Sequence, residues 1–227
     1  MKQHIPVITV DGPSGSGKGT LSHHVAEMLG WHFLDSGALY RVLAHAALSK
    51  GISVEDPVAL AKVAAHLEVS FVGSPPQILL NGQNITLAIR TEECGNAASK
   101  VAKLPEVRKA LLERQRAFLE PPGLVADGRD MGTVVFPEAL LKIFLEASPE
   151  VRAQRRQIQL KEQGVNVSLG DLFAEIAERD ARDRQRAVSP LVPASDAIVI
   201  DTTAFTIDEV FGIVMAKVFD KGITAKK

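Results

Sequence analysis

The strongest chemical signal in the sequence is the glycine-rich segment TVDGPSGSGKGTL, which covers residues 9–21. Gly12, Gly17 and Lys18 fit the phosphate-loop pattern G-x-x-x-x-G-K-S/T, in which backbone N–H groups surround phosphates and the lysine reaches the terminal ones. An apolar run precedes the segment and a helical pattern follows it, which is the context that this loop needs. The sequence therefore predicts a site that binds the phosphates of a nucleotide.

The residue after the lysine departs from the common pattern. It is Gly19 rather than Ser or Thr, with Thr20 one position late, so the hydroxyl that switch GTPases and ATPases place on Mg²⁺ is displaced. A dinucleotide-binding loop does not fit either, because the third glycine of G-x-G-x-x-G would fall at Thr20 and Lys18 interrupts the motif. The phosphate chemistry done here must tolerate the displaced hydroxyl.

A second candidate segment, DSGALYR, covers residues 35–41 just beyond the next apolar run. The carboxyl ends of parallel strands face the ligand crevice in α/β proteins, so Asp35, Ser36 and Arg41 could reach a substrate there. The alternative is that Asp35 or Ser36 is a helix N-cap and that Arg41 lies in solvent. The phosphate loop elsewhere in the chain favours the functional interpretation.

The third segment, GLVADGRDMGTVVF, covers residues 123–136. Its apolar run ends in Asp127, an arrangement that resembles the strand and carboxylate found near Mg²⁺ in phosphoryl-transfer enzymes. Arg129 and Asp130 follow at once. A solvated turn is the alternative, but such a turn has no need of an arginine. We therefore expect carboxylates and an arginine at the edge of the nucleotide site.

The fourth segment, ERDARDRQRAV, covers residues 178–188. On a helix Arg179, Asp183 and Arg186 would share one face, with Arg182 between them, because they are spaced at i, i+4 and i+7. A salt-bridged surface helix is the alternative. A further cationic cluster lies upstream, at Arg152, Arg155 and Arg156. So many arginines in a chain of net charge −1 indicate phosphate rather than nucleic acid as the counter-charge.

The composition is that of a soluble globular protein. The chain has 227 residues, of which 46% are hydrophobic, enough for one large domain or for a domain with an insertion. Its single cysteine, Cys94, can form neither an internal disulfide nor a multi-cysteine zinc site, which fits a reducing cytoplasm. The first residues run directly into an apolar strand, and no stretch has the roughly 18 apolar residues of a membrane span. We therefore expect a cytoplasmic protein with no membrane or nucleic-acid partner. The oligomeric state does not follow from these features, and a monomer is our working expectation.

The elements that must position these residues follow from the hydrophobic pattern. Short apolar runs bounded by turns predict strands at Ile5–Val10, His32–Leu34, Leu124–Ala126, Lys142–Leu145 and Ala197–Ile200. Helical patterns lie between them, including one over residues 21–29 that Gly30 can end and one over residues 207–218. Strands that alternate with helices predict an α/β fold with a parallel sheet covered on both faces.

The region between residues 51 and 119 breaks this alternation. HLEVSF alternates with period two, and QILLNGQNIT carries an Asn81-Gly82 pair suited to a tight hairpin turn. Helical patterns follow over about residues 91–102 and 105–119. We interpret residues 51–119 as an inserted subdomain with a small antiparallel sheet. The remaining core domain then comprises residues 1–50 and 120–227.

Taken together, GPSGSGKGT, DSGALYR, DGRDMGTVVFP and ERDARDR resemble, in order and spacing, the bacterial-type cytidylate kinases among the P-loop nucleoside monophosphate kinases. The resemblance covers nearly the whole chain. It implies a three-layer fold with a five-stranded parallel sheet in the order 2-3-1-4-5, a nucleotide-binding insertion, and a mobile lid, here at about residues 150–166. It also implies an enzyme that transfers the γ-phosphoryl group of ATP to CMP or dCMP. Such kinases commonly show G-K-G-T in the loop and hold Mg²⁺ largely through phosphates and water, which accounts for Gly19.

The resemblance implies a role for each candidate residue. Donor binding would fall to Gly12, Pro13, Ser14, Gly15, Ser16, Gly17, Lys18, Gly19 and Thr20, with Arg155 and Arg156 as lid arginines. Acceptor binding would fall to Asp35, Ser36, Arg41, Ser99, Arg108, Asp127, Arg129, Asp130, Arg179, Asp183 and Arg186. The residues acting in catalysis would be Lys18, Arg41, Arg129 and Arg186. Asp127 would be the carboxylate nearest the Mg²⁺, which phosphates and water largely hold.

The acceptor residues divide further by the part of the nucleotide that they would contact. The resemblance assigns the acceptor phosphate to Arg41, Arg129 and Arg186, the sugar hydroxyls to Arg179 and Asp183, and the base to Ser99, Arg108 and Asp130. A carboxylate can accept from the N4 amino group of cytosine, and an arginine can donate to its N3 and O2. Uracil would instead turn its O4 acceptor toward the carboxylate, leaving polar groups unpaired.

Two other functions stay open. A kinase that acts on a small-molecule hydroxyl would use the same fold with Asp35 as general base. A regulatory nucleotide switch would normally carry D-x-x-G and N-K-x-D elements, which this chain lacks.

Overall fold

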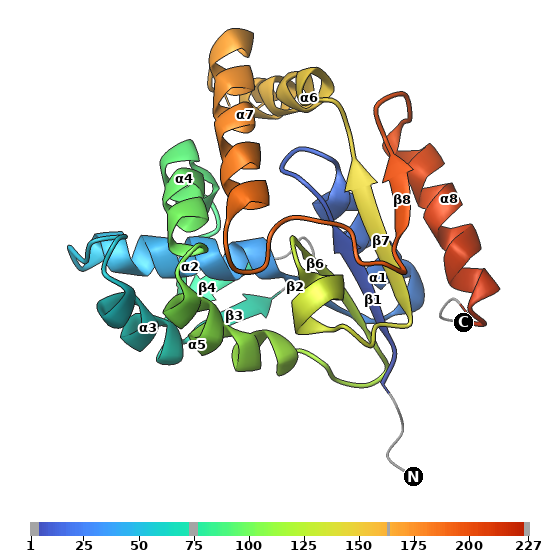
Figure 1. Ribbon diagram of the computed structural model, residues 1–227, viewed down its shortest axis with the longest axis horizontal. Helices are drawn as coiled ribbons and strands as arrows, with labels where there is room; N and C mark the ends of the chain where they lie inside the picture. Colours follow the sequence, from blue (N-terminus) through green and yellow to red (C-terminus); the bar gives the residue numbers. More distant parts are fainter. Residues whose placement is uncertain (1–4, 73–76, 163, 225–227) are drawn as a thin grey trace. The chain divides into compact units, whose positions relative to one another are not determined.

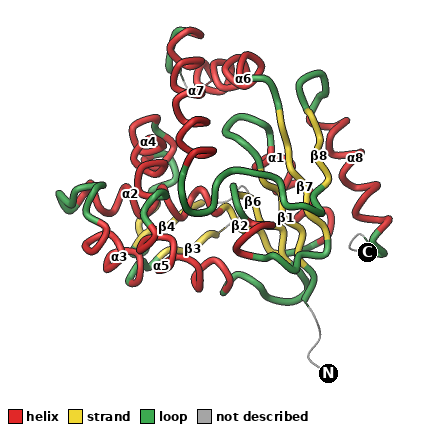
Figure 2. The backbone as a smooth tube through the Cα atoms, viewed as in Figure 1, coloured by secondary structure: helices red, strands yellow, loops and turns green. Residues whose placement is uncertain are grey.

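The computed structural model describes residues 5–72, 77–162 and 164–224. Its contacts divide the chain into two compact units. The core unit is formed by Met1–Leu34 with Phe118–Lys227, and the inserted unit by Asp35–Ala117. Figure 1 follows the chain through each unit, and Figure 2 separates strands from helices by colour.

The core unit contains a five-stranded sheet within the described residues. Its strands are β1 (Val7–Asp11), β2 (His32–Asp35), β6 (Leu124–Gly128), β7 (Leu141–Glu146) and β8 (Ile198–Asp201). Their order is β2-β6-β1-β7-β8, and β1 pairs in parallel with both β6 and β7. Counted along the chain this is the order 2-3-1-4-5, so the expected α/β fold and strand order are confirmed. Each predicted strand forms within two residues of its expected bounds.

Helices and one π-helical turn complete the core unit. They are α1 (Lys18–Leu29), η2 (Met131–Val135), α6 (Pro149–Glu162), α7 (Leu169–Gln185) and α8 (Ile207–Asp220). Gly30 ends α1 in the left-handed conformation, as the sequence predicts, and its N–H bonds back to the carbonyls of the last turn. Thr206 and Glu209 form a capping box that begins α8. Figure 1 shows α6 leaving the end of β7, with α7 lying against it.

The two faces of β1 contact different parts of the core unit. Ile8 and Val10 are fully buried in the apolar core that the sheet shares with α1 and α8. Because successive side chains of a strand point to opposite faces, Thr9 and Asp11 face the other side, where they meet η2. One face of the strand therefore packs in the apolar core, and the other face contacts the GRDMG segment.

The inserted unit combines helices with a small antiparallel sheet. Its elements are α2 (Ser36–Ser49), α3 (Pro57–Ala65), β3 (Val69–Val72), β4 (Gln77–Leu80), β5 (Gln83–Asn84), the 3₁₀ turn η1 (Ala88–Arg90), α4 (Glu92–Val101) and α5 (Pro105–Arg116). Asn81 and Gly82 join β4 to β5 with φ of 49° and 78°, the positive values that a type I′ hairpin turn requires. The predicted hairpin is therefore confirmed. Leu43, Leu60 and Leu111 lie in the apolar core of this unit.

Two boundaries differ from those expected. The helix expected over residues 105–119 ends at Arg116, where the Ala117 N–H closes the last turn on the Glu113 carbonyl at 2.9 Å. By its contacts α2 groups with the inserted unit, whereas the sequence analysis assigns it to the core domain. The assignment of residues 51–119 as a monophosphate-binding subdomain stays a prediction. Within the described ranges, no helix combines the length and the apolar character needed to cross a membrane.

Candidate functional site

The phosphate loop connects β1 to α1 through glycines that a larger residue could not replace without strain. Gly15 and Gly17 have φ of 78° and 89°, in the left-handed region that favours glycine. At Gly12, φ is 153° and a Cβ would lie 2.3 Å from the carbonyl oxygen of Leu145 on β7. The glycines therefore allow the loop to turn and allow β7 to approach it closely.

Several carbonyl groups of the loop are bound by donors from the protein. The Pro13 carbonyl accepts hydrogen bonds from Ser16 Oγ at 3.0 Å and from Lys18 Nζ at 3.1 Å. Thr202 Oγ1, just after β8, lies 3.3 Å from the carbonyl oxygen of Ser16. Because the two polar groups of a trans peptide point in opposite directions, holding a carbonyl on one side directs the N–H of the same peptide to the other. An anion needs such N–H donors, so the loop is suited to phosphate.

Gly19 lies directly beside Asp127. A Cβ on Gly19 would be 3.2 Å from Asp127 Oδ2, tighter than ordinary van der Waals contact. Asp127 is buried at the carboxyl end of β6, where the sequence predicts it. The bare backbone at Gly19 therefore leaves room for a carboxylate at the start of α1, and a serine or threonine there would crowd it.

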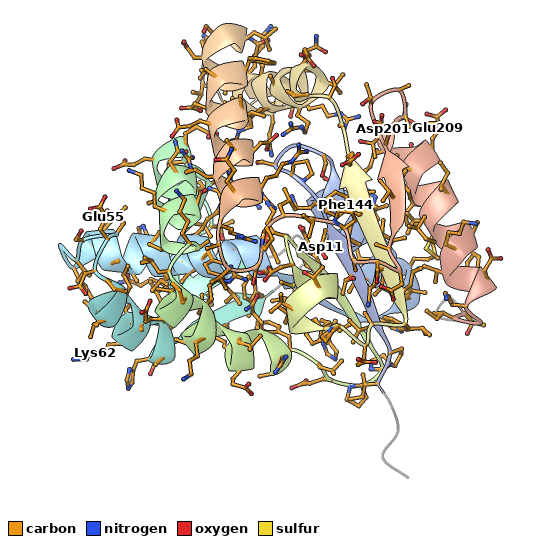
Figure 3. All side chains as sticks on the ribbon, viewed as in Figure 1. Asp11, Glu55, Lys62, Phe144, Asp201 and Glu209 are labelled. Atoms are coloured by element: carbon orange, nitrogen blue, oxygen red, sulfur yellow. The ribbon has the colours of Figure 1, made fainter. Side chains whose placement is uncertain are left out.

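Asp11 organises the GRDMG segment, and the sequence analysis missed it. Its Oδ1 accepts from the backbone N–H of Met131 and its Oδ2 from that of Gly132, each at 2.8 Å. These bonds anchor the segment immediately after Asp130, which is itself buried. In Figure 3, Asp11 is labelled at the end of β1 together with Phe144, its register partner on β7. A carboxylate ending a buried strand directly before the phosphate loop was the available signal.

The environment of Asp11 disfavours its charge. Burial, which outweighs the two backbone hydrogen bonds, raises the pKa of Asp11 from 3.8 to about 6. The neighbouring Asp130 also raises this pKa, whereas Arg129 lowers it. The carboxylate that holds the GRDMG segment therefore titrates much closer to neutrality than an ordinary aspartate.

Arg129 and Asp183 form an ion pair within the core unit. Arg129 Nε donates to Asp183 Oδ2 at 2.9 Å, and both side chains are largely buried. Burial alone would raise the pKa of Asp183. The positive charges of three arginines outweigh burial and lower this pKa; they are Arg129, Arg179 and Arg186. Burial likewise opposes the charge of Arg129, and Asp183 outweighs it, so the pKa of Arg129 is raised. Both groups are therefore held in their charged forms.

The expected helical face over residues 179–186 needs a correction. Helix α7 ends at Gln185, and Arg186 follows in an extended conformation, so it does not share a helical face with Arg179 and Asp183. Its Nε donates to the carbonyl of Ser189 instead. Beyond the end of the helix, the Leu191 N–H bonds back to the Asp183 carbonyl at 2.9 Å, which satisfies one of the last helical carbonyls.

Two arginines of α7, Arg179 and Arg182, have different partners. Arg179 Nη1 lies 3.5 Å from Ser14 Oγ, so this side chain reaches the phosphate loop. Arg182 pairs with the exposed Glu178 one turn earlier on the helix, although its own side chain is only 12% exposed. Arg179 is therefore directed toward the loop, whereas Arg182 is paired within the helix.

The two proposed lid arginines bind protein groups near α6. Arg155 donates to Thr202, through Nη1 to Oγ1 at 3.1 Å and through Nη2 to the carbonyl at 2.7 Å. Arg156 Nη1 donates to Gln159 Oε1 at 2.7 Å on the same helix. Thr202 thus lies between Arg155 and the carbonyl of Ser16 in the phosphate loop. No sequence motif predicted this contact.

In the inserted unit, the first candidate residues lie at the start of α2. Asp35 is the N-cap of this helix and accepts from the Ala38 N–H at 2.9 Å, as the alternative interpretation describes. Ser36 Oγ donates to Gln115 Oε1 at 2.8 Å, and both residues are buried. Arg41 donates to the carbonyl of Ile89 at 2.8 Å, so it does not simply extend into solvent.

The candidate base-binding residues of the inserted unit lie on α4 and α5. Ser99 and Arg108 are both buried. Arg108 Nη1 donates to the carbonyl of Ala102 at 3.2 Å, and its guanidinium lies 5.8 Å from the ring centre of Tyr40. That ring is at the distance of a cation–π interaction. The arginine is therefore oriented by the protein itself.

Known proteins resemble the chain over nearly its whole length. A family model described as cytidylate kinase matches residues 8–220. A curated cytidylate kinase of Shewanella amazonensis is 56% identical over 225 residues, which are 97% of this chain and 97% of that one. Those of Aeromonas salmonicida and Serratia proteamaculans are 58% identical over 218 residues and 60% identical over 207 residues. These alignments cover 95% and 90% of each chain, respectively. The chain therefore belongs to the cytidylate kinase family.

Proposed function

We propose that the chain transfers the γ-phosphoryl group of ATP to CMP or dCMP, giving ADP with CDP or dCDP. The main support is the phosphate loop, in which Lys18 begins α1 and the carbonyls of Pro13 and Ser16 are held by protein groups. Membership of the cytidylate kinase family supports the choice of acceptor.

This transfer needs no general base. The acceptor attacks through a phosphate oxygen that is already mostly ionised at pH 7, because the second pKa of a phosphate monoester is about 6. The chain must then bring two polyanions into line and neutralise the charge on the moving group. We assign that task to Lys18, Arg41, Arg129 and Arg186. Asp183 orients Arg129 before the acceptor binds.

Asp127 is our candidate for the carboxylate that faces Mg²⁺. It is buried beside Gly19 at the start of α1, and carboxylate oxygen is a ligand that Mg²⁺ accepts readily. The described residues contain no cluster of three or more histidine, cysteine or acidic side chains that could hold a metal, so phosphates and water would supply the other ligands. When bound, the ion would neutralise charge on the β- and γ-phosphates.

Cytosine selection is assigned to Asp130, Arg108 and Ser99. Each of these side chains is buried, and leaving a buried polar group unpaired against the wrong base costs free energy. The sugar hydroxyls are assigned to Arg179 and Asp183, and Ser36 to a place near the acceptor phosphate. Asp35 already caps α2, which favours its role as an N-cap over a general base for a hydroxyl acceptor.

The decisive experiment is a coupled ADP-release assay with ATP and Mg²⁺. CMP, dCMP, UMP and AMP are offered in turn, followed by a panel of alcohols. We expect turnover with CMP and dCMP, weak turnover with UMP, and only background hydrolysis with the alcohols. Preference for an alcohol, or equal turnover with all monophosphates, would replace the proposal with the hydroxyl kinase or with an unselective kinase. We also expect a monomer by gel filtration and a cytoplasmic location.

A further inference from the structure

Arg152, on the first turn of α6, is enclosed by protein on all sides. It is 1% exposed, and arginine is seldom so fully buried unless it is paired. Its guanidinium forms a two-pronged ion pair with Asp180 on α7, at 3.1 Å from Nη1 to Oδ1 and 2.5 Å from Nη2 to Oδ2. Its Nε donates to the Ala147 carbonyl at 2.9 Å. The geometry matches the planar fork of arginine and could not be reproduced by lysine.

The same guanidinium reaches the phosphate loop. Arg152 Nη1 also donates to the carbonyl oxygen of Ser14 at 3.1 Å. The next residue, Gly15, rests against the backbone of α6, since a Cβ on it would lie 3.1 Å from Arg152 Cβ and 3.3 Å from its carbonyl oxygen. The loop is therefore held against α6 at this point by both close packing and a hydrogen bond.

The bond to Ser14 determines where the Gly15 N–H points. In a trans peptide the carbonyl of one residue and the N–H of the next point in opposite directions. Holding the Ser14 carbonyl toward Arg152 directs the Gly15 N–H away from α6. A reversed peptide would present a carbonyl oxygen instead, which repels a phosphate.

We propose that Arg152, oriented by Asp180, is a positioning residue for the donor nucleotide: it holds the Ser14–Gly15 peptide so that the Gly15 N–H is available to the donor phosphates. Arg152 itself does not need to touch the nucleotide. The inference rests on the proposed function for the identity of the donor, and it predicts a defect on the donor side alone.

The first test is Arg152→Lys, which keeps one positive charge beside Asp180 but offers three N–H donors, too few for the four hydrogen bonds that Arg152 makes to Ala147, Ser14 and Asp180. ADP binding is measured by calorimetry in the absence of any acceptor, with circular dichroism and a thermal melt to establish folding. We expect the Kd for ADP to rise about tenfold, the effect of weakening one good phosphate contact. The KM for ATP should rise by a similar factor, and the KM for CMP should change less than about twofold.

The matched control is Lys161→Met, which removes an exposed positive charge from the same helix. It should leave the Kd for ADP unchanged. If Arg152→Lys does not fold, Arg152→Met combined with Asp180→Leu replaces the buried pair by apolar side chains and leaves no buried charge unpaired. That double variant should also bind ADP more weakly, because the Ser14 carbonyl has lost its donor.

A folded Arg152 variant whose ADP affinity stays within twofold of the wild type would overturn the inference. An equal rise in the KM values for ATP and CMP would do the same, because it would indicate a general structural defect. Failure of the proposed function is a separate result: the wild type would then bind ADP but release none from ATP when CMP is added.

Discussion

Arg129 and Asp183 are 54 positions apart in the chain, yet Arg129 Nε lies 2.9 Å from Asp183 Oδ2. The arginine comes from the segment after β6 and the aspartate from the last turns of α7. Arg179 and Arg186 also act on the same carboxylate and help to keep it ionised. A single buried aspartate therefore connects the GRDMG and ERDARDR segments, which the sequence shows only as separate motifs.

Removing the charge of Asp183 should destabilise the core unit. Asp183→Asn leaves Arg129 buried without its hydrogen-bonded counter-charge, and breaking a buried pair in this way costs about 3 kcal/mol of the free energy of unfolding. The measurement is denaturant unfolding of wild type and variant. Asp220→Asn is the control, because its carboxylate is 70% exposed and 3.8 Å from Lys217, and its loss should cost less than about 0.5 kcal/mol. Equal losses in both variants would contradict a buried, coupled pair.

Lys18→Met should leave a folded protein with almost no transfer activity. Methionine keeps the bulk of the side chain but not the ammonium group that stabilises charge on the moving phosphoryl group. Losing such a group costs about 10²- to 10³-fold in kcat. Turnover of ATP and CMP is measured alongside the thermal melt. Near-wild-type turnover in a folded variant would exclude Lys18 from the chemistry.

Asp130→Asn should weaken the distinction between cytosine and uracil. An asparagine amide can rotate to donate to uracil O4 or accept from cytosine N4, so the penalty against uracil largely disappears. We expect the kcat/KM ratio for CMP over UMP to fall by roughly 10- to 100-fold, mainly through loss with CMP. Steady-state kinetics on both monophosphates provide the measurement, and the KM for ATP is the internal control. An unchanged ratio would mean that Asp130 does not read the base.

Asp11 should make the unfolding free energy depend on pH. Its pKa is about 6 in the folded protein against an ordinary value of 3.8, so the folded state binds the proton more tightly and this contribution to stability falls as pH rises from about 4 to 6. A difference of about two pKa units corresponds to about 3 kcal/mol. Asp11→Asn cannot titrate, so the stability of the wild type relative to the variant should decline by that amount between pH 3 and pH 7. Denaturant unfolding at several pH values tests this, and a constant difference would refute it.

Two glycine substitutions should have opposite effects on stability. Gly12→Ala places a Cβ 2.3 Å from the Leu145 carbonyl at a positive φ, and overpacking with backbone strain should cost about 3 kcal/mol. Gly212 lies within α8, and a Cβ added there would meet nothing within 4 Å, so Gly212→Ala should stabilise by about 0.5–1 kcal/mol. Thermal melts of both variants provide the comparison. A stable Gly12→Ala protein would mean that β7 and the loop can separate at little cost.

Local patterns were enough to predict most of the fold. Apolar runs predicted the strands, including β1 and β7, and their alternation with helices predicted the parallel sheet. Asn81-Gly82 predicted the hairpin because only residues that tolerate positive φ make that turn. The phosphate loop could also be placed, since its glycines and lysine are close together in the chain. Each of these features depends on residues within a few positions of one another.

Local patterns could not predict which groups the charged side chains would contact. The sequence showed Arg152 only as one of three arginines in a cationic cluster, but it is buried against Asp180, which is 28 positions away. Asp11 follows the strand predicted at Ile5–Val10 and received no role, but its bonds go to Met131 and Gly132, which are 120 and 121 positions further on. Arg186 was expected on a helix that in fact ends before it, where the chain turns back at Leu191.

The physical reason for the difference is the range of the interactions. Periodicity and turn chemistry act between neighbours in the chain, so the sequence by itself determined the strands, the hairpin and the phosphate loop. The pairing of a charge is decided by which groups lie within a few ångströms once water has been excluded, because burial both strengthens the attraction and penalises a charge left alone. Only the tertiary structure could therefore decide that Asp183 holds Arg129 and that Arg152 holds Ser14.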